Sequence, residues 1–206
     1  MTNSQPYHRA HLRQTLLAAA VKLIAEVGPR AFTLREVARR AGVSHNAPYR
    51  HFASKDELLA EVAAEGFDRL TASMRKRMKR GGSAMERLQE CGCGYVEFAL
   101  RWPQHFLVMF DLPRPAQEHE MHKAAGHNAY AVLLECTTAA QQSGDFPAGD
   151  SLPLVWAAWS FVHGIAKLTI SGNLPFDARS AVEFTRIASQ ILFSGMTVGR
   201  SEAHAS

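Results

Sequence analysis

The sequence predicts an all-α protein of 206 residues. Three observations support this fold class. Apolar residues recur at helical spacing through most of the chain, S/T-x-x-E capping boxes stand before three of these periodic segments, and no segment alternates apolar and polar residues as a half-buried strand does. We therefore expect helices joined by short loops, and no sheet.

Composition limits the class of protein. Apolar residues make up 47% of the chain, as in a soluble globular protein, and no window approaches the roughly eighteen uninterrupted apolar residues of a membrane span. The N-terminus opens with a polar stretch and not with a signal peptide, so we expect a cytoplasmic protein. Cys91, Cys93 and Cys136 are too few and too oddly spaced for a disulfide framework or a tetrahedral zinc site, and we expect reduced thiols.

Charge divides the chain into two parts. Residues 1–80 hold 15 Lys and Arg against 7 Asp and Glu, a net charge of +8, whereas residues 81–206 hold 8 against 12, a net charge of −4. The first part suits a polyanion such as nucleic acid, and the second does not. The charge pattern therefore indicates a nucleic-acid module joined to a domain with another task.

Residues 33–52 predict two short helices that meet at a tight corner. Thr33 and Glu36 form a capping box that begins the first helix. Its expected buried face consists of Leu34, Val37, Ala38 and Ala41. Gly42 stands where the first helix must end in a turn with positive φ, and Ser44 is expected to cap the second helix.

The second helix of this corner carries more polar side chains than a core can accept. They are His45, Asn46, Tyr49, Arg50 and His51. Most must face away from the core, as is required of a helix that reads a DNA groove. Helix corners with a small residue and a glycine also occur in proteins that never bind nucleic acid, so the corner alone leaves both interpretations open.

The remaining helices follow from periodicity and turn residues. A first helix is expected from about Arg9 to Val27, with an apolar stripe of Leu12, Leu16, Ala19, Ala20, Leu23 and Val27. Later helices are expected at about residues 55–80, 83–101, 104–110, 116–143, 151–171 and 177–196, with capping boxes at Ser54 and Ser83. We expect residues 199–206 to form a disordered tail.

Two groups of basic residues could either contact DNA phosphate or form a solvated surface. Arg9 and Arg13 are placed either to meet phosphate or to form a solvated face, and the sequence does not choose between these. The run from Arg75 to Arg80 lies about 25 residues, roughly 37 Å, from the start of its helix. We interpret that run as a solvated helix end and not as a DNA contact.

The sequence was also searched for ligand-binding, metal-binding and catalytic residues. Residues 154–170 are apolar on more than one helix face and should be buried on several sides. Within them, His163 is expected to be either a core histidine, satisfied by a backbone carbonyl or a neighbouring hydroxyl, or a ligand contact. His119, His122 and His127 do not share one helix face, so we expect no metal site. We expect no cofactor and no enzyme activity, because the chain has no nucleophile elbow, Walker loop or dinucleotide fingerprint.

Several short runs resemble the DNA-binding domain of the tetracycline-repressor (TetR) family of bacterial regulators. They are Phe32-Thr33-Leu34, Val37-Ala38, residues 41–44, residues 49–52 and residues 54–59. The resemblance covers roughly residues 9–62. Residues 159–164 (WSFVHG) are similar to the W-x-x-x-H-G signature of one subgroup of TetR-type C-terminal domains. The resemblance implies a three-helix helix-turn-helix domain at residues 1–54 and a larger ligand-binding and dimerisation domain at residues 55–198.

The resemblance also implies positions that contact DNA. Thr33, Tyr49, His51 and Lys55 match phosphate-contacting positions, whereas Arg35, His45, Asn46 and Ala47 match positions near base edges, just after the Ser44 cap. Pro48 departs from the common pattern. Because proline removes the first backbone hydrogen bond of the recognition helix, that helix is expected to start late or to tilt.

For the C-terminal half, the resemblance implies a homodimer in which the last two helices pack against their copies, with a close approach at Gly164. An apolar effector is expected in a pocket of large apolar residues with few polar groups. The expected lining is Phe67, Phe98, Trp102, Phe106, Met109, Phe110, Trp156, Trp159 and His163. The alternative for these side chains is that they simply fill the core.

The function implied is that of a transcriptional repressor released from a palindromic operator on double-stranded DNA by a small molecule. The alternative is a DNA-binding dimer without an effector. In that case the C-terminal half serves only for dimerisation or for protein partners. A ligand-sized apolar cavity would separate the two hypotheses.

Overall fold

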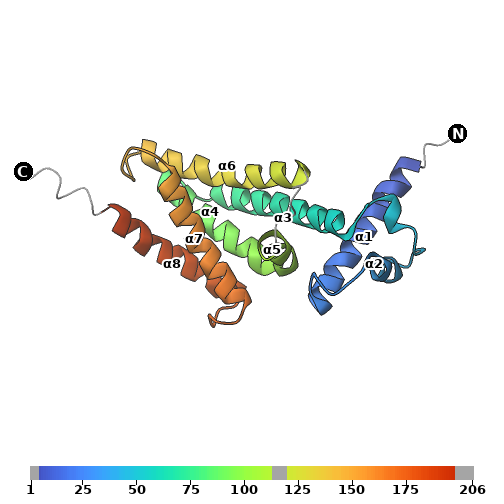
Figure 1. The fold of residues 1–206 in the computed structure, drawn as a ribbon. Coiled ribbons are helices and arrows are strands. Elements are labelled where there is room, and N and C mark those ends of the chain that lie inside the picture. The colour runs from blue at the N-terminus through green and yellow to red at the C-terminus, as the bar shows by residue number, and fades with distance from the viewer. Residues whose placement is uncertain (1–4, 113–119, 198–206) are drawn as a thin grey trace, which may run out of the picture. The chain divides into compact units, whose positions relative to one another are not determined.

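The computed structural model describes residues 5–112 and 120–197, and all regular structure in these ranges is helical (Figure 1). The α-helices are α1 (Gln5–Val27), α2 (Leu34–Arg40), α3 (Lys55–Met78), α4 (Ala84–Arg101), α5 (Pro103–Phe110), α6 (Glu120–Gln142), α7 (Leu152–Ile170) and α8 (Ala178–Thr197). One 3-10 turn, η1 (Pro48–Arg50), lies between α2 and α3. The all-α fold class is therefore confirmed. The expected tail at residues 199–206 and the expected helix start at residues 116–119 lie outside the described residues.

The chain divides into two compact units. The first comprises Met1–Gly66 and Gln104–Ala125, and the second comprises Phe67–Pro103 and Gly126–Ser206. The first unit therefore contains the predicted DNA-binding domain together with the first half of α3 and most of α5. The boundaries predicted for the functional domains, at residues 54 and 198, stay predictions.

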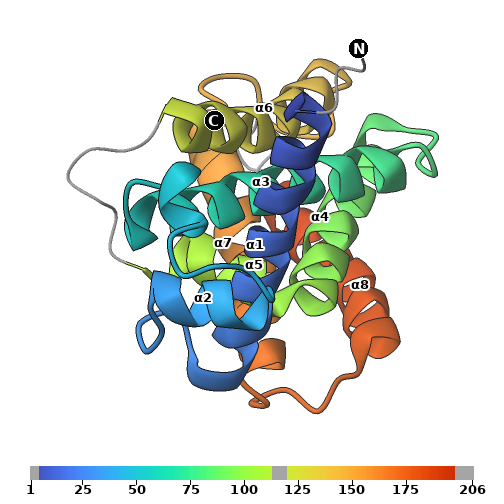
Figure 2. The same ribbon diagram turned by 90° about the vertical axis from the view of Figure 1, so that its right-hand side faces the viewer.

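In the first unit, α1 and α2 lie side by side (Figures 1 and 2). The predicted stripe of α1 is buried at Leu16, Ala19, Ala20 and Leu23. Val27, the last residue of α1, is instead 51% exposed, and Ile24, which was not part of the predicted stripe, is buried. The helix also begins four residues before the predicted Arg9, since its first turn is polar and leaves no apolar stripe to detect.

Local capping signals placed the helix starts correctly. Thr33 with Glu36, and Ser83 with Glu86, form complete capping boxes at the starts of α2 and α4. At α3 the box is altered: the Glu57 amide donates to Ser54 Oγ at 3.1 Å, but the Glu57 carboxylate accepts from the Ala53 amide. All three helices begin within one residue of the position expected from these boxes.

In the second unit, α4 packs against both α7 and α8 (Figure 1). Every residue of α4 from Glu90 to Val96 is buried, so this middle stretch of the helix is covered on all sides. The sequence prediction assigned such burial to residues 154–170. Within one chain that prediction is wrong, because Trp156 is 56% exposed and Leu168 is 45% exposed on α7.

Two glycines allow the close packing of α4. A Cβ on Gly94 would lie 2.8 Å from Met74 Cα, and one on Gly92 would lie 3.0 Å from a methyl group of Val162. Ser73 Oγ also donates to the Gly94 carbonyl at 2.8 Å, which ties α3 to α4 at this crossing. A Cβ on Gly164 would meet nothing within 4 Å. The close approach expected at Gly164 is therefore not made within one chain.

We expect Gly94→Ala to lower the free energy of unfolding by about 1–3 kcal/mol, because the added methyl group would press on the α3 backbone, which cannot rotate away. Gly126→Ala in α6 is the matched control. Its Cβ would make only ordinary contact with Phe67, at 3.8 Å, and alanine favours a helix over glycine. Urea denaturation measures both changes, and equal effects of the two substitutions would contradict the close approach.

Candidate functional site

The corner between α2 and the segment that follows it is built by backbone geometry. Gly42 has φ of +70°, its amide donates to Arg39, and the Val43 amide donates to the Ala38 carbonyl at 3.0 Å. These two bonds form a Schellman motif, which ends a helix at a glycine in the left-handed region. The positive-φ turn predicted at Gly42 is confirmed.

After this corner the chain does not form the predicted Ser44-capped α-helix. The Ala47 amide donates to the Ser44 carbonyl at 2.9 Å, and Ala47 then precedes the 3-10 turn η1. Pro48 is the first residue of η1, where its missing N–H costs no hydrogen bond. The expected late start is therefore observed, but as a short 3-10 turn. We call residues 44–52 the reading segment.

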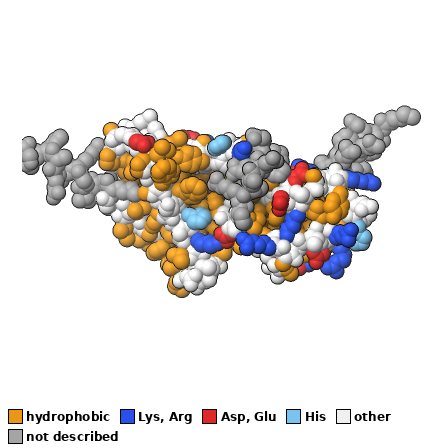
Figure 3. All heavy atoms as spheres, in the orientation of Figure 1, with side chains coloured by type: hydrophobic (Ala, Val, Ile, Leu, Met, Phe, Trp, Pro, Cys, Tyr) orange, Lys and Arg blue, Asp and Glu red, His pale blue; other side chains and the backbone are white. Residues whose placement is uncertain are grey.

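Most of the predicted DNA-contacting side chains reach solvent. Thr33, Arg35, Ser44, His45, Asn46 and Tyr49 are exposed, and His51 and Lys55 are half-buried. Ala47 is only 7% exposed and has little surface to offer a base edge. Lys and Arg side chains also gather on the N-terminal unit in Figure 3. The first unit thus presents a polar and basic surface around the reading segment.

Lys55 is also held within the first unit. Its Nζ donates to the Arg30 carbonyl at 2.9 Å and lies 4.4 Å from the centre of the Phe32 ring. Burial lowers the pKa of Lys55. An ammonium group has three donors, so one hydrogen bond to Arg30 leaves donors for a phosphate. Lys55 therefore fixes the start of α3 against the loop after α1.

Arg13 has a structural role besides the two alternatives considered for it, which both stay open because its side chain is 42% exposed. It forms an ion pair with Glu61 of α3, which is only 7% exposed, and its guanidinium lies 5.9 Å from the centre of the Phe52 ring. Arg13 therefore joins α1 to α3 and covers the end of the reading segment. The side chain of Arg9 is outside what the structure describes.

His163 has the neighbouring hydroxyl expected of a core histidine. Its Nδ1 lies 2.9 Å from the Tyr95 hydroxyl, and Trp159 Nε1 donates to the same hydroxyl at 3.3 Å. The Tyr95 hydroxyl thus joins two side chains of α7, and the tautomer of His163 sets which partner donates in the Tyr95–His163 bond. Burial raises the pKa of Tyr95, so the hydroxyl keeps its proton. Sequence reasoning did not single out Tyr95, whose position is set by distant packing.

The predicted pocket residues do not fall in one unit. Phe67, Phe98, Trp102, Trp156, Trp159 and His163 belong to the second unit, whereas Phe106, Met109 and Phe110 belong to the first. The ring centres of Trp102 and Phe98 are 5.7 Å apart. The guanidinium groups of Arg69 and Arg101 lie 5.2 and 4.8 Å from the centre of the Trp102 ring, as cation–π contacts. Trp156 is exposed and does not line the interior of its unit.

Sequence reasoning also missed His105 on α5, which is 3% exposed. Its Nε2 lies 3.5 Å from a carboxylate oxygen of Glu65 on α3, in the same unit. Neither ring nitrogen has a hydrogen-bond partner within the part of the chain described. No local pattern around His105 predicts its burial, because the apolar residues after it dominate the periodicity of α5.

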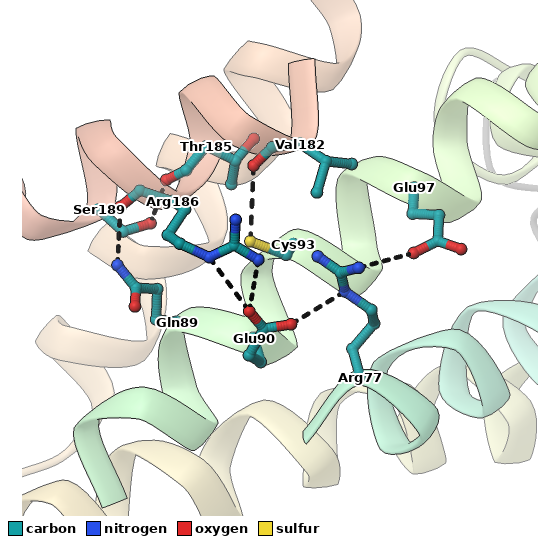
Figure 4. A network of polar contacts seen from close by, with 9 residues as sticks. All are labelled: Arg77, Gln89, Glu90, Cys93, Glu97, Val182, Thr185, Arg186 and Ser189. Carbon is teal, nitrogen blue, oxygen red and sulfur yellow. Dashed lines mark hydrogen bonds and ion pairs between the residues drawn. The ribbon is translucent and has the colours of Figure 1, made fainter. Parts of the chain in front are cut away.

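A second polar cluster surrounds Glu90 of α4, which lies between Arg77 of α3 and Arg186 of α8 (Figure 4). Arg77 Nε is 3.0 Å from one Glu90 oxygen, and Arg186 Nη2 donates to the other at 2.7 Å. The bond to Glu90 raises the pKa of Arg186. Glu97 lies 3.5 Å from Arg77 Nη1 and adds a second acidic group. We call these four side chains the Glu90 network.

The Glu90 network corrects the interpretation of the basic run at Arg75 to Arg80. Arg77 is only 7% exposed, so the run is not a uniformly solvated end. Arg75, by contrast, pairs at 2.9 Å with Glu135, and both of these side chains are about half exposed. A local charge pattern could not separate the two arginines, because the difference comes from which face of α3 meets α4.

In the described ranges, no group of three or more His, Cys, Asp and Glu side chains is placed to hold a metal ion. His119 and the side chain of His122, considered above with His127, lie outside what the structure describes. No described helix is both long and apolar enough to cross a membrane.

Comparison with known proteins identifies the class to which this fold and corner belong. A family model described as bacterial regulatory proteins of the tetR family matches residues 16–62, and one described as the tetracyclin repressor-like C-terminal domain matches residues 88–190. The chain is thus a regulatory protein with a helix-turn-helix domain. It belongs to the TetR family.

The chain is also similar to individual proteins. A Rhodococcus sp. RHA1 structure described as a protein with unknown function is 32% identical, with a TM-score of 0.79 over 94% of this chain and 99% of that chain. The HTH-type transcriptional repressor KstR2 of Mycobacterium tuberculosis is 39% identical over 77 residues, which cover 37% of this chain and 38% of KstR2. The chain therefore spans well under half the length of this curated relative.

The fold also resembles that of the transcriptional regulator FadR from Bacillus subtilis in complex with stearoyl-CoA. That structure is 19% identical, with a TM-score of 0.72 over 88% of this chain and 98% of that chain. At this identity the similarity shows the shared fold alone. Membership in the W-x-x-x-H-G subgroup stays a prediction.

We expect Glu90→Ala to lower the free energy of unfolding by about 3–5 kcal/mol, because it leaves Arg77 buried with only the more distant Glu97. Glu135→Ala is the matched control, since it breaks an exposed pair from the same basic run and should cost less than about 1 kcal/mol. Thermal and urea denaturation of the two variants measure the difference. Similar small losses in both would show that the Glu90 network contributes little to stability.

Proposed function

We propose that this protein represses transcription as a homodimer bound to a palindromic operator on double-stranded DNA in the cytoplasm. The observation that carries the proposal is the reading segment, which follows a complete Schellman corner and exposes His45, Asn46 and Tyr49 in a chain of the TetR family. Repression is favoured because the printed name of the KstR2 relative is that of a repressor. Two measurements test the proposal. The purified protein should bind the operator, and expression of a reporter gene behind that operator should increase when the regulator is deleted.

Within this proposal, phosphate contacts come from Thr33, Tyr49, His51 and Lys55. Base contacts come from Arg35, His45 and Asn46, since Ala47 is buried. The Thr33 hydroxyl and amide already bond to Glu36, and these bonds lower the pKa of Glu36. A phosphate only accepts hydrogen bonds, so the phosphate contact of Thr33 requires its hydroxyl proton to turn from Glu36 to the phosphate oxygen.

We expect Lys55→Ala to weaken binding to all DNA sequences and to flatten the dependence of affinity on salt, because a phosphate contact carries no sequence information. Asn46→Ala should instead change base preference, because an amide reads base edges. Fluorescence anisotropy with the operator and with single-base variants, at several salt concentrations, distinguishes the two effects. If both substitutions act equally on every sequence, the assignment of contacts fails.

Because Lys55 also ties α3 to the Arg30 carbonyl, loss of DNA binding in Lys55→Ala has a second explanation. Lys55→Arg separates the two. It keeps a positive charge for phosphate while its planar guanidinium does not reproduce the ammonium bond to Arg30. If Lys55→Arg loses operator affinity together with thermal stability, as Lys55→Ala does, Lys55 has only the structural role; if it keeps operator affinity and the salt slope, the phosphate contact is supported.

Dimerisation is proposed to use the exposed faces of α7 and α8. Leu152, Trp156, Gly164 and Leu168 recur at multiples of four on α7, and all except the half-buried Gly164 are exposed. Ile187 and Ile191 on α8 are 53% and 72% exposed. Apolar side chains stand out on the C-terminal unit in Figure 3. Apolar rows on two neighbouring helices suit packing against the same helices of a second copy.

We expect Gly164→Leu to weaken the dimer, because a large side chain where backbones approach costs roughly 1–3 kcal/mol. Within the chain the substitution should be harmless, since a Cβ on Gly164 would meet nothing within 4 Å. Sedimentation equilibrium gives the dimer affinity and circular dichroism the fold. A two-fold dimer should then bind half-sites about 34–36 Å apart, or a multiple of that distance. A variant that remains a tight dimer would count against this interface.

The effector is proposed to be a small apolar molecule bound in the second unit, near Phe98, Trp159 and His163. Large apolar side chains with few polar groups are the usual chemistry of such a site, and the FadR structure of the same fold holds stearoyl-CoA. The second half of α3 belongs to the second unit and its start adjoins the reading segment. Displacement of α3 by a ligand would therefore reach the DNA-contacting residues.

We expect an effector to lower operator affinity at least tenfold, which requires about 1.4 kcal/mol of preference for the non-DNA conformation. Stearoyl-CoA, stearic acid and a panel of apolar metabolites are screened by thermal shift, and each hit is titrated against the protein–operator complex. His163→Ala should reduce both the thermal shift and the release. If hits leave operator affinity unchanged, the C-terminal half serves for dimerisation or protein partners only.

A further inference from the structure

Three parts of the first unit meet at the guanidinium group of Arg13. This group forms an ion pair with Glu61 of α3, and its central carbon lies 5.9 Å from the centre of the Phe52 ring, at the end of the reading segment. Arg13 itself belongs to α1 and stands 48 residues before Glu61 in the chain. One side chain thus connects the first helix, the reading segment and the long helix α3.

Both groups that Arg13 contacts are buried. Glu61 is 7% exposed and Phe52 is 1% exposed. A buried carboxylate is costly unless it is paired, and the positive charge of Arg13 offsets part of that cost. Because the guanidinium group is planar and meets a carboxylate on one side and an aromatic ring on another, these two contacts together fix its orientation.

Phe52 in turn supports the exposed part of the reading segment. Its amide donates to the Pro48 carbonyl at 2.9 Å, which closes the turn η1 that carries Tyr49 and Arg50. Tyr49 and Arg50 are exposed, whereas Pro48 and Phe52 are buried. The position of the Phe52 ring therefore sets where the exposed side chains of η1 lie.

On the basis of the proposed function, we propose that Arg13 is a positioning residue for operator binding, which acts through Glu61 and Phe52 and not as a phosphate contact. Opposite charges in contact cancel much of each other's field, so DNA phosphate gains less from the paired guanidinium of Arg13 than from an unpaired cation. The role of Arg13 is instead to hold the Phe52 ring, and with it η1, against α1 and α3.

The negative charge of Glu61 separates this role from a purely electrostatic one. Removal of a negative charge from a DNA-binding unit strengthens its general attraction to phosphate, and it would also release Arg13 to contact DNA. A positioning role predicts the opposite sign for Glu61→Gln, because the neutral amide no longer holds Arg13 as an ion pair. Glu61 itself is too buried to contact DNA.

The experiment measures the affinity of the full-length protein for two DNA duplexes by fluorescence anisotropy at several salt concentrations. One duplex is an operator that the wild-type protein selects from a random library, and the other has the same base composition in shuffled order. We expect Glu61→Gln to weaken operator binding about tenfold, which corresponds to about 1.4 kcal/mol. Binding to the shuffled duplex should not weaken, and the salt slope should not change. A merely structural role would not change the ratio of the two affinities.

Variants of Arg13 complete the test. Arg13→Met should lower operator affinity about as much as Glu61→Gln, and the double variant should lose no more than either single variant, because the two side chains act as one unit. Arg13→Lys keeps a positive charge for Glu61 and should recover part of the lost affinity. Losses that add in the double variant would contradict a shared role.

Glu26→Gln is the matched control. It removes the same charge from another ion pair of the first unit, which Glu26 of α1 forms with Arg40 of α2. The side chains of Glu26 and Arg40 are 51% and 32% exposed, so water replaces the lost contact. Operator affinity should stay the same or rise in this variant.

Three results would overturn the positioning role. They are unchanged or stronger operator binding in Glu61→Gln, an equal loss in Glu26→Gln, and a flatter salt slope with equal losses on both duplexes in Arg13→Met, which marks a phosphate contact. Circular dichroism establishes that each variant is folded at the temperature of the measurement.

If Glu61→Gln does not fold, the Arg13 variants decide the question. A loss that is confined to the operator and partly recovered by lysine supports the positioning role, whereas a loss shared by both duplexes contradicts it. A wild type that selects no DNA sequence from the library would contradict the proposed function, and the positioning role with it.

Discussion

The burial of every α4 residue from Glu90 to Val96 is the constraint on which the second unit depends. A helical stretch with no solvent face cannot leave polar side chains in water, yet this stretch carries Glu90, Cys91, Cys93 and Tyr95. Each of these groups must therefore find a partner on a neighbouring helix. The two glycines at positions 92 and 94 bring those helices close enough to supply one.

The partners of α4 define how the helices of this unit align. Glu90 is met by Arg77 from α3 and by Arg186 from α8, and Tyr95 is met by two side chains of α7. If α8 slid by one turn, Glu90 would lose Arg186 and keep only the buried Arg77. An apolar core tolerates such shifts more easily, because one aliphatic contact resembles another. Buried polar pairs thus penalise wrong alignments more strongly than they stabilise the correct one.

Much of the fold could be predicted from the sequence because it depends on local signals. Capping residues such as Thr33 and Ser83 act within four residues of themselves, and the glycine at position 42 meets a purely backbone requirement. The late start at Pro48 was predicted, but the form of the element was not, because a 3-10 turn stands where a short α-helix was expected. Local sequence therefore gave the elements and most of their ends.

The features that sequence reasoning missed depend on distant contacts. The run around Arg77 looks solvated because five of its six residues are basic, and only the packing of α4 shows that one of them is buried. The apolar character of α7 was detected, but hydrophobicity does not say whether a face is covered by the same chain or by another copy. The opposite error occurred for α4, whose glycines and polar residues gave no sign that every residue from Glu90 to Val96 is buried.

The placement of the reading segment relies on its two neighbouring helices, because the segment itself is short of backbone hydrogen bonds. A 3-10 turn of three residues contributes little rigidity. Phe52 at its end is 1% exposed and lies beneath Arg13 of α1, which in turn is paired with Glu61 of α3. Lys55 adds a second tie, from the start of α3 to the loop after α1. The reading segment is therefore tied to α3 at two points, through Arg13 with Glu61 and through Lys55, while its own 3-10 turn adds few backbone hydrogen bonds.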